Sequence, residues 1–211
     1  TLLPVQSHLS ENKQEIAWVK ELEPESSCYG DAYYRYGLFG QTPTLMAHCC
    51  YTDGEELQLM REQNVYAVHC PTSNCNLASG IAPVRKLLQQ GVNVALGSDI
   101  AGGHHLSMFR VMQYAVQMSK LQYTASDGKY PFLTLSEVFY MATKVGGSLF
   151  GKVGSFEKGY AFDALVIDDL CLSPHHLITS SPIERLERFV YLGDDRQIQH
   201  RFCQGNEIKQ V

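Results

Sequence analysis

One pattern recurs three times in this sequence: a short apolar segment ends at a polar side chain and is followed by a helix signal. The three segments end at His8, His48 and Asp99. Short apolar strands that alternate with helices are typical of parallel sheets that helices cover on both faces. The pattern therefore predicts an α/β fold in which these three side chains lie at the ends of different strands.

The predicted elements alternate between strands and helices along the first 151 residues. Strands are expected at 2–8, 44–48, 65–70 and 92–96, and helices at 11–22, 53–63, 82–90, 106–121 and 134–142. Ser10 and Thr52 are the expected N-caps of the first two helices, and Pro71–Asn74 has the composition of a turn. Right-handed crossovers would make this alternation half of a barrel or a doubly wound sheet.

The sequence changes character after residue 151, where turn residues and short strand candidates replace the longer helices. Residues 164–168 form one expected strand, and residues 188–192 and 200–203 are two further candidates. We therefore expect two domains, residues 1–151 and residues 152–211, of which the second holds a terminal helix and a β-rich segment.

The composition excludes some classes of partner. With a net charge of −5, the chain lacks the clustered positive charge that nucleic-acid binding needs. No apolar run approaches the roughly 18 residues of a membrane span, and no signal peptide opens the chain. The 7 cysteines are odd in number and scattered, which is typical of free thiols in a reducing cytosol. We thus expect a cytoplasmic protein with neither a nucleic-acid nor a membrane partner.

The polar residues at the strand ends are of the types that bind a catalytic zinc ion. Zinc takes histidine nitrogens and carboxylate oxygens as ligands, and a βα barrel supplies them from the carboxyl ends of different strands. A single histidine or aspartate in such a place is usually structural, but His8, His48 and Asp99 occur together on three strand ends. Glu11 follows the first of them and can reach a water or substrate at the metal. Together these residues predict a zinc hydrolase site.

Four segments that carry these residues are similar to the signature segments of the amidohydrolase superfamily, and within it to the guanine deaminase family. They are residues 8–12, 47–49, 69–74 and 97–103. Residues 154–159 and 164–167 are similar to the closing β-segment of the superfamily, and residues 191–196 resemble a stretch found in guanine deaminases. The resemblance covers essentially the whole chain. It implies the C-terminal half of a (β/α)8 barrel, from the fifth strand onward, with part of a small β-rich domain.

The resemblance also implies a role for each residue of the predicted site. His8 and Asp99 would be zinc ligands from the fifth and eighth strands, and Asp99 would also accept a proton. His48, on the sixth strand, would hydrogen-bond the metal-bound water or the substrate, and Glu11 would be the proton shuttle. All four side chains would contact the substrate, while residues 69–74 would form the floor of the pocket.

The implied function is the zinc-dependent hydrolytic deamination of guanine to xanthine and ammonia. The superfamily opens its barrel with a His-x-His pair, and no two of the 8 histidines here have that spacing. We therefore expect one zinc ion with two further ligands outside this chain, and no activity from the chain alone. Its expected partners are the purine substrate and either a missing N-terminal half or a second copy, with a homodimer for the full-length protein.

Two other functions are compatible with the same residues. Another aminohydrolase or chlorohydrolase of the superfamily, acting on a triazine, pyrimidine or adenosine-type ring, would also use Glu11 and His48. A non-catalytic fragment that serves only in association would carry the motifs without using them. The adjacent His104 and His105 predict exposed loop histidines rather than a second metal site.

Overall fold

The computed structural model describes residues 3–172 and 180–209. The chain divides into two compact units, Thr1–Leu133 and Thr134–Val211. This division comes earlier than the boundary expected near residue 151, because the helix that starts after Thr134 belongs to the second unit. Each unit is described by itself.

The first unit contains a four-stranded parallel sheet in the order β1-β2-β3-β4. The strands are β1 (Val5–Leu9), β2 (Thr44–His48), β3 (Tyr66–His69) and β4 (Val94–Leu96). All three residues of β4, the last strand in this order, are buried, as expected for a parallel sheet that is covered on both faces. The predicted parallel α/β arrangement is confirmed, and the expected strands differ only at their ends.

The register of the sheet places the strand ends at one edge. Leu9 pairs with His48 across β1 and β2, and His69 pairs with Leu96 across β3 and β4. Because parallel strands all point the same way, the residues that follow them emerge on the same side. This edge is where His8, His48 and Asp99 were predicted to meet.

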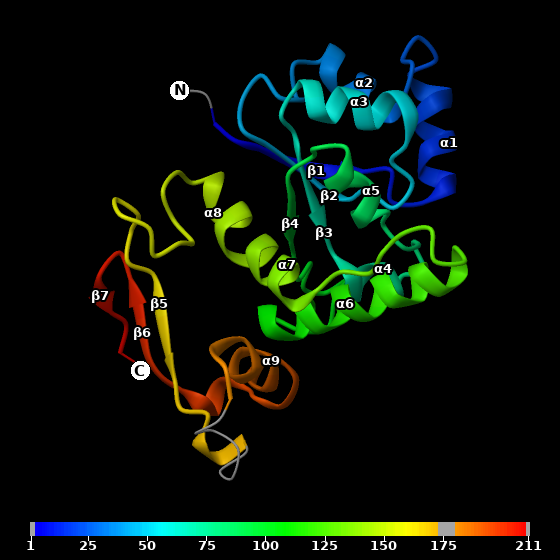
Figure 1. Ribbon diagram of the computed structural model, residues 1–211. Coiled ribbons are helices and arrows are strands. Elements are labelled where there is room, and N and C mark those ends of the chain that lie inside the picture. The colour runs from blue at the N-terminus through cyan, green and yellow to red at the C-terminus, as the bar shows by residue number, and fades with distance from the viewer. Residues whose placement is uncertain (1–2, 173–179, 210–211) are drawn as a thin grey trace. The chain divides into compact units, whose positions relative to one another are not determined.

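Helices connect the strands of the first unit. They are α1 (Lys13–Leu22), α2 (Tyr29–Arg35), α3 (Gly54–Glu62), α4 (Pro71–Asn76), α5 (Val84–Gln89) and α6 (Met108–Ala125). Figure 1 shows α1, α2 and α3 close together, in blue to cyan, where α2 contacts both of the others. Helix α6 packs against α4 and β4, with Val111, Met112 and Ala115 among its buried residues.

Two predicted N-caps were wrong by one or two residues. Asn12, not Ser10, caps α1, because its side chain accepts from the Glu15 amide in a reciprocal capping box. The cap of α3 is Asp53 rather than Thr52, and its carboxylate accepts from the Gly54 amide. Ser10 is left free for a different hydrogen bond, described with the site below.

The predicted turn at residues 71–74 was also wrong, because these residues begin helix α4. Pro71 stands at the start of the helix, where its lack of an amide hydrogen costs nothing and its fixed φ angle favours the first turn. Proline followed by small polar residues is therefore compatible with both a turn and a helix start.

The second unit begins with one helical stretch and continues into a small sheet. Its elements are α7 (Leu135–Tyr140), a π-helical turn (Met141–Val145), α8 (Gly146–Ser148), β5 (Ala164–Ile167), a 3-10 turn (Leu170–Leu172), α9 (Pro182–Leu192), a second 3-10 turn (Asp195–Gln197), β6 (Ile198–Cys203) and β7 (Asn206–Glu207). Thr134 and Glu137 form a capping box at the start of α7. Figure 1 shows β5, β6 and β7 as neighbours, and their pairing is antiparallel.

The predicted strand at residues 188–192 was wrong, since these residues are the last turns of α9. The helix starts at a capping box that Ser181 forms with Glu184, and Pro182 occupies its first turn. Arg185 donates two hydrogen bonds of 2.8 and 2.6 Å to the carboxylate of Asp169, and this guanidinium lowers the pKa of Asp169. The ion pair ties α9 to the 3-10 turn that ends at Leu172.

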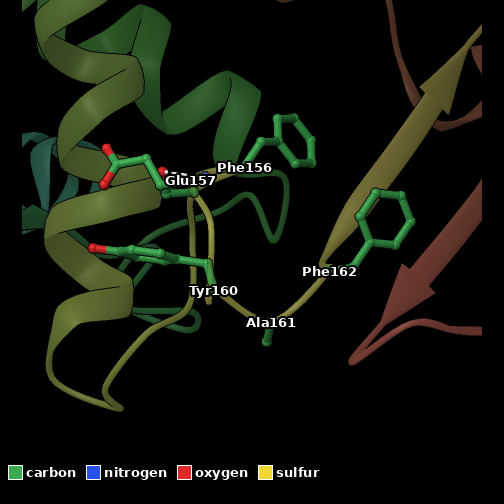
Figure 2. Close-up of a pocket in the computed structure, with 6 residues that line it drawn as sticks. Phe156, Glu157, Tyr160, Ala161 and Phe162 are labelled. Atoms are coloured by element: carbon green, nitrogen blue, oxygen red, sulfur yellow. Dashed lines mark hydrogen bonds between the residues drawn. The ribbon is translucent and has the colours of Figure 1, made fainter.

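A pocket of about 400 Å³ lies in the second unit (Figure 2). Its lining is largely aromatic and comprises Ser155, Phe156, Glu157, Tyr160, Ala161 and Phe162. Glu157, the only carboxylate of this lining, forms an ion pair with Lys144. The pocket therefore lacks the histidine and free carboxylate donors of the predicted zinc site.

All 7 cysteines are free thiols, as the sequence predicted. Cys49, Cys50 and Cys70 are buried, in keeping with their place in apolar segments. No helix within residues 3–172 and 180–209 is long and apolar enough to cross a membrane.

Candidate metal centre

Three of the four predicted site residues form one compact group of potential metal ligands. The ligand atoms of His8, Glu11 and His48 all lie within 4.8 Å of one another. The two imidazole rings meet edge to face with their centroids 4.8 Å apart. Within the described ranges, this is the only group of three or more such side chains that could hold a metal ion.

Asp99 also lies in this cluster, opposite the same histidine. Its Oδ2 atom lies 3.9 Å from Nε2 of His48, and Oε2 of Glu11 lies 3.7 Å from that nitrogen. The structure thus brings together all four residues that the sequence singled out.

His48 stands at the centre of the cluster and has only 1% of its surface exposed. Its Nδ1 atom lies 2.9 Å from Oδ1 of Asn74. A carbonyl oxygen only accepts, so Nδ1 carries the proton and Nε2 has a free lone pair. This buried Nε2 has no hydrogen-bond partner among the described residues. An unpaired buried nitrogen that faces two carboxylates is suited to a metal ion, a water or a substrate proton.

Glu11 is held by contacts on both its side chain and its backbone. Ser79 donates a hydrogen bond of 2.6 Å from its hydroxyl to Oε1 of Glu11. The backbone amide of Glu11 donates to Oε2 of Glu15, at 2.9 Å, in the first turn of α1. These contacts leave Oε2 of Glu11 facing His48.

The glycine-rich segment after β4 packs tightly around Asp99. A Cβ atom at Gly102 would lie 2.8 Å from Oδ2 of Asp99, and one at Gly103 would overlap the carbonyl oxygen of Ser98. Asn76 of α4 donates a hydrogen bond of 2.8 Å to the Gly102 carbonyl oxygen. The chain folds back against Asp99 here and leaves no room for a side chain at either position. Glycine is therefore needed at both.

The backbone at the ends of β1, β2 and β4 adopts conformations that side chains rarely allow. The φ angles of Ser10, His48 and Asp99 are +46°, +72° and +45°. Such left-handed residues cost on the order of 1–3 kcal/mol each, and they concentrate at functional sites. Packing that tolerates three of them at one sheet edge is consistent with a functional site there.

A buried carboxylate supports the left-handed turn at Ser10. The Ser10 hydroxyl donates to Oε2 of Glu56 at 2.7 Å, and the Gly30 amide donates to Oε1 at 3.0 Å. Burial raises the pKa of Glu56, which has only 4% of its surface exposed. Glu56 thereby joins α2 and α3 to the turn between His8 and Glu11.

Two groups next to the cluster are kept uncharged by burial. Desolvation, with a smaller contribution from the neighbouring His48, lowers the pKa of His69 to about 4. Burial, aided by the charge of Asp99, raises the pKa of the Cys70 thiol to about 12. His69 is therefore a neutral residue in the segment predicted to form the pocket floor, and Cys70 is no nucleophile near neutral pH.

We expect His69 to make the first unit less stable in acid. Its pKa is 6.5 when unfolded and about 4 when folded, so protons favour the unfolded chain. The neutral His69 contributes its full share to the free energy of unfolding above pH 6.5, and this contribution is lost as the pH falls towards 4. At about 1.4 kcal/mol per pKa unit, the loss amounts to about 3 kcal/mol. Urea unfolding at several pH values, on the parent and on His69→Gln, measures this loss.

The His69→Gln variant should have a flatter dependence of unfolding free energy on pH between 6.5 and 4 than the parent. His104→Gln, at an exposed histidine of the same unit, is the control and should keep the slope of the parent. Equal slopes for the parent and His69→Gln would contradict the assignment.

His104 is exposed, as predicted, whereas His105 is partly buried. Their rings lie 4.3 Å apart, but no third ligand of the described chain joins them. His104 instead contacts the side chains of Asn76 and Tyr114, at 3.1 and 3.3 Å.

The sequence did not predict Ser79 and Glu56 as parts of the site. Asn74 was predicted within the pocket floor, but its hydrogen bond with the central histidine was not. Ser79 and Glu56 lie in segments with no recognisable motif, and only the fold brings them to Glu11 and Ser10. No local signal in the sequence distinguishes them from surface residues.

The chain is similar to known proteins over nearly its whole length. The model of the amidohydrolase family matches residues 2–208. A guanine deaminase from Dictyostelium discoideum is 40% identical over 211 residues, which are 97% of this chain and 46% of that protein.

Two solved structures have folds similar to that of this chain. The crystal structure of a guanine deaminase from C. acetobutylicum, with guanine bound in its active site, is 59% identical with a TM-score of 0.94, over 98% of this chain and 49% of that one. An adenosine deaminase from Xanthomonas campestris with bound zinc is 27% identical with a TM-score of 0.80, over 97% and 45% of the two chains. This chain spans about half the length of the curated relatives it matches.

Proposed function

Because this chain belongs to the amidohydrolase family, we propose that it supplies part of the active site of a zinc-dependent guanine deaminase, which converts guanine and water to xanthine and ammonia. It would form the second half of a (β/α)8 barrel and part of a small β-rich domain. The observation that carries the proposal is the buried Nε2 of His48, which has no partner and faces the carboxylates of Glu11 and Asp99.

The donor set fits zinc, which prefers histidine nitrogen and carboxylate oxygen. His8 and Asp99 would hold one ion, together with two further ligands outside this chain. When bound, the zinc ion would act as a Lewis acid, which makes water a stronger acid and a better nucleophile. The lone pair on Nε2 of His48 would accept a hydrogen bond from the reacting water or the substrate.

The two carboxylates would move the protons of the reaction. As the oxygen of water adds to the carbon that bears the amino group, Asp99 would take the proton that the water loses. Glu11 would carry the second proton of the water to the neighbouring ring nitrogen, and Asp99 would pass its proton to the amino group. The carbon–nitrogen bond breaks and ammonia leaves, so that one water is consumed for each ammonia released.

The proposed site is incomplete in this chain, which matches just under half of its guanine deaminase relatives. We expect the chain alone to be inactive, because His8 and Asp99 would be the only zinc ligands that it supplies. A segment with the missing ligands, or self-association, would complete the site, and the complete protein would be a homodimer. The free thiols of the chain support a cytoplasmic location.

Reconstitution tests this proposal. The chain would be co-expressed with the part of the C. acetobutylicum enzyme that it does not match, purified, and assayed for zinc, xanthine and ammonia. We expect about one zinc per complex and ammonia release from guanine, with neither from the chain alone. The control complex carries His8→Ala and should lack zinc.

Two outcomes would contradict parts of the proposal. In the first, the complex binds zinc but releases ammonia only from adenosine, the substrate type in the name of the Xanthomonas enzyme. The substrate would then be another ring and not guanine. In the second, the complex folds but binds no zinc. This result would contradict the proposed metal site and would favour a non-catalytic role for the chain.

A further inference from the structure

The two oxygens of the Glu11 carboxylate have different surroundings. Oε1 accepts the short hydrogen bond from the Ser79 hydroxyl, at 2.6 Å. Oε2 faces Nε2 of His48 at 3.7 Å, too far for a hydrogen bond between them. Ser79 therefore occupies one lone pair of Oε1, whereas Oε2 is the oxygen that faces the central histidine of the cluster.

Ser79 is itself held in a fixed position. It has only 4% of its surface exposed, and its backbone amide donates to the carbonyl oxygen of Asn74 at 3.0 Å. Its neighbours Ala78 and Gly80 have φ angles of +54° and +144°, so the chain turns sharply on both sides of it. The Tyr51 side chain packs against this turn, since a Cβ atom at Gly80 would lie 3.0 Å from the Tyr51 hydroxyl.

Asn74 connects this turn to the central histidine. Its side-chain Oδ1 accepts from Nδ1 of His48, while its backbone carbonyl accepts from the Ser79 amide. One residue thus orients both the histidine and the serine that holds Glu11. A short path through α4 and the turn after it therefore links the side chains of His48 and Glu11.

We propose that Ser79 is a positioning residue that occupies Oε1 of Glu11 and so makes Oε2 the oxygen that transfers the proton. This inference rests on the proposed role of Glu11 as proton shuttle. A hydroxyl-to-carboxylate hydrogen bond is short and strong, so it selects one orientation of the carboxylate. A displacement of about 1 Å at a reacting group can cost about 10²-fold in rate, so holding Glu11 would matter for turnover.

A structural test needs no activity. Crystal structures of this chain with Ser79→Ala and with Ser79→Thr would be compared with that of the parent. In Ser79→Ala the Glu11 carboxylate should leave its position beside His48 or occupy several rotamers, whereas Ser79→Thr keeps the hydroxyl and should keep the parent position. An unchanged Glu11 carboxylate in Ser79→Ala would overturn the proposal.

A kinetic test uses the reconstituted complex. We expect Ser79→Ala to lower kcat for guanine by about 10- to 100-fold, with KM within about twofold and zinc content unchanged, and Ser79→Thr to restore most of kcat. Ser119→Ala is the matched control, because Ser119 is also buried but its hydroxyl hydrogen-bonds within α6 and to the Leu133 amide. It should leave kcat at the parent value.

A double-mutant cycle separates positioning from a general structural effect. If Ser79 acts through Glu11, adding Ser79→Ala to Glu11→Gln should lower kcat no further. Losses that multiply would show that Ser79 acts independently of Glu11, and the proposal would fail. A parent complex that releases no ammonia from guanine would reject the proposed function instead, and the crystal structures would still decide whether Ser79 holds Glu11.

Discussion

Glu11→Gln in the reconstituted complex is expected to lower kcat for guanine by about 10²–10⁴-fold, the usual contribution of a general acid–base, and to leave the zinc content unchanged. Glutamine keeps the size of the side chain and a carbonyl oxygen that can accept from Ser79, but it cannot carry a proton between water and substrate. Steady-state rates of ammonia release and metal analysis of the same sample would measure both quantities.

Glu55→Gln provides the control for that variant, because Glu55 is an exposed carboxylate in the first turn of α3. It should have the kcat and the zinc content of the parent. Loss of zinc from Glu11→Gln would contradict the shuttle role, since it would make Glu11 a ligand of the metal. The grouping of Glu11 with His8 and His48 within 4.8 Å makes that a real alternative outcome.

Asp99→Asn is expected to lower both zinc content and activity, and so to differ from Glu11→Gln. The neutral amide is a weaker ligand than a carboxylate and cannot accept the proton of the water. Loss of a hydrogen bond that only supports a metal ligand lowers metal affinity by about 10–100-fold. Replacing a ligand itself, as in Asp99→Asn, should lower zinc affinity by more than this. Zinc titration with a competing chelator, followed by the ammonia assay at saturating zinc, would separate the two effects.

Asp127→Asn is the matched control for the backbone at Asp99. Both aspartates have left-handed φ angles, +45° at Asp99 and +49° at Asp127, and asparagine tolerates that conformation. The control should therefore bind zinc and release ammonia as the parent does. Full zinc affinity in Asp99→Asn would remove Asp99 from the proposed ligands.

The sequence predicted the four strands of the first unit well, because each is a short apolar run between clear helix and turn signals. It failed where one local pattern serves two structures. Pro71 and its small polar neighbours begin a helix instead of forming a turn. Residues 188–192 are apolar enough for a strand, but the capping box at Ser181 starts a helix that runs through them.

The sequence predicted that the four site residues lie together, but it did not predict the contacts that hold them. His8 and His48 lie at the ends of strands, and Glu11 and Asp99 follow strands, so the sequence alone could place them on one sheet edge. Ser79 meets Glu11 across 68 residues, and Glu56 meets Ser10 across 46 residues. No local pattern encodes such contacts, because they depend on how the connecting helices pack.

What the sequence by itself determined was the alternation of strands and helices and the types of side chain at the strand ends. Both follow from properties that extend over a few residues, namely apolar periodicity and the position of polar residues beside it. Only the tertiary structure decided which nitrogen of His48 is free and which oxygen of Glu11 faces it. Those choices are made by single hydrogen bonds from Asn74 and Ser79, and their geometry exists only after the sheet and α4 have packed together.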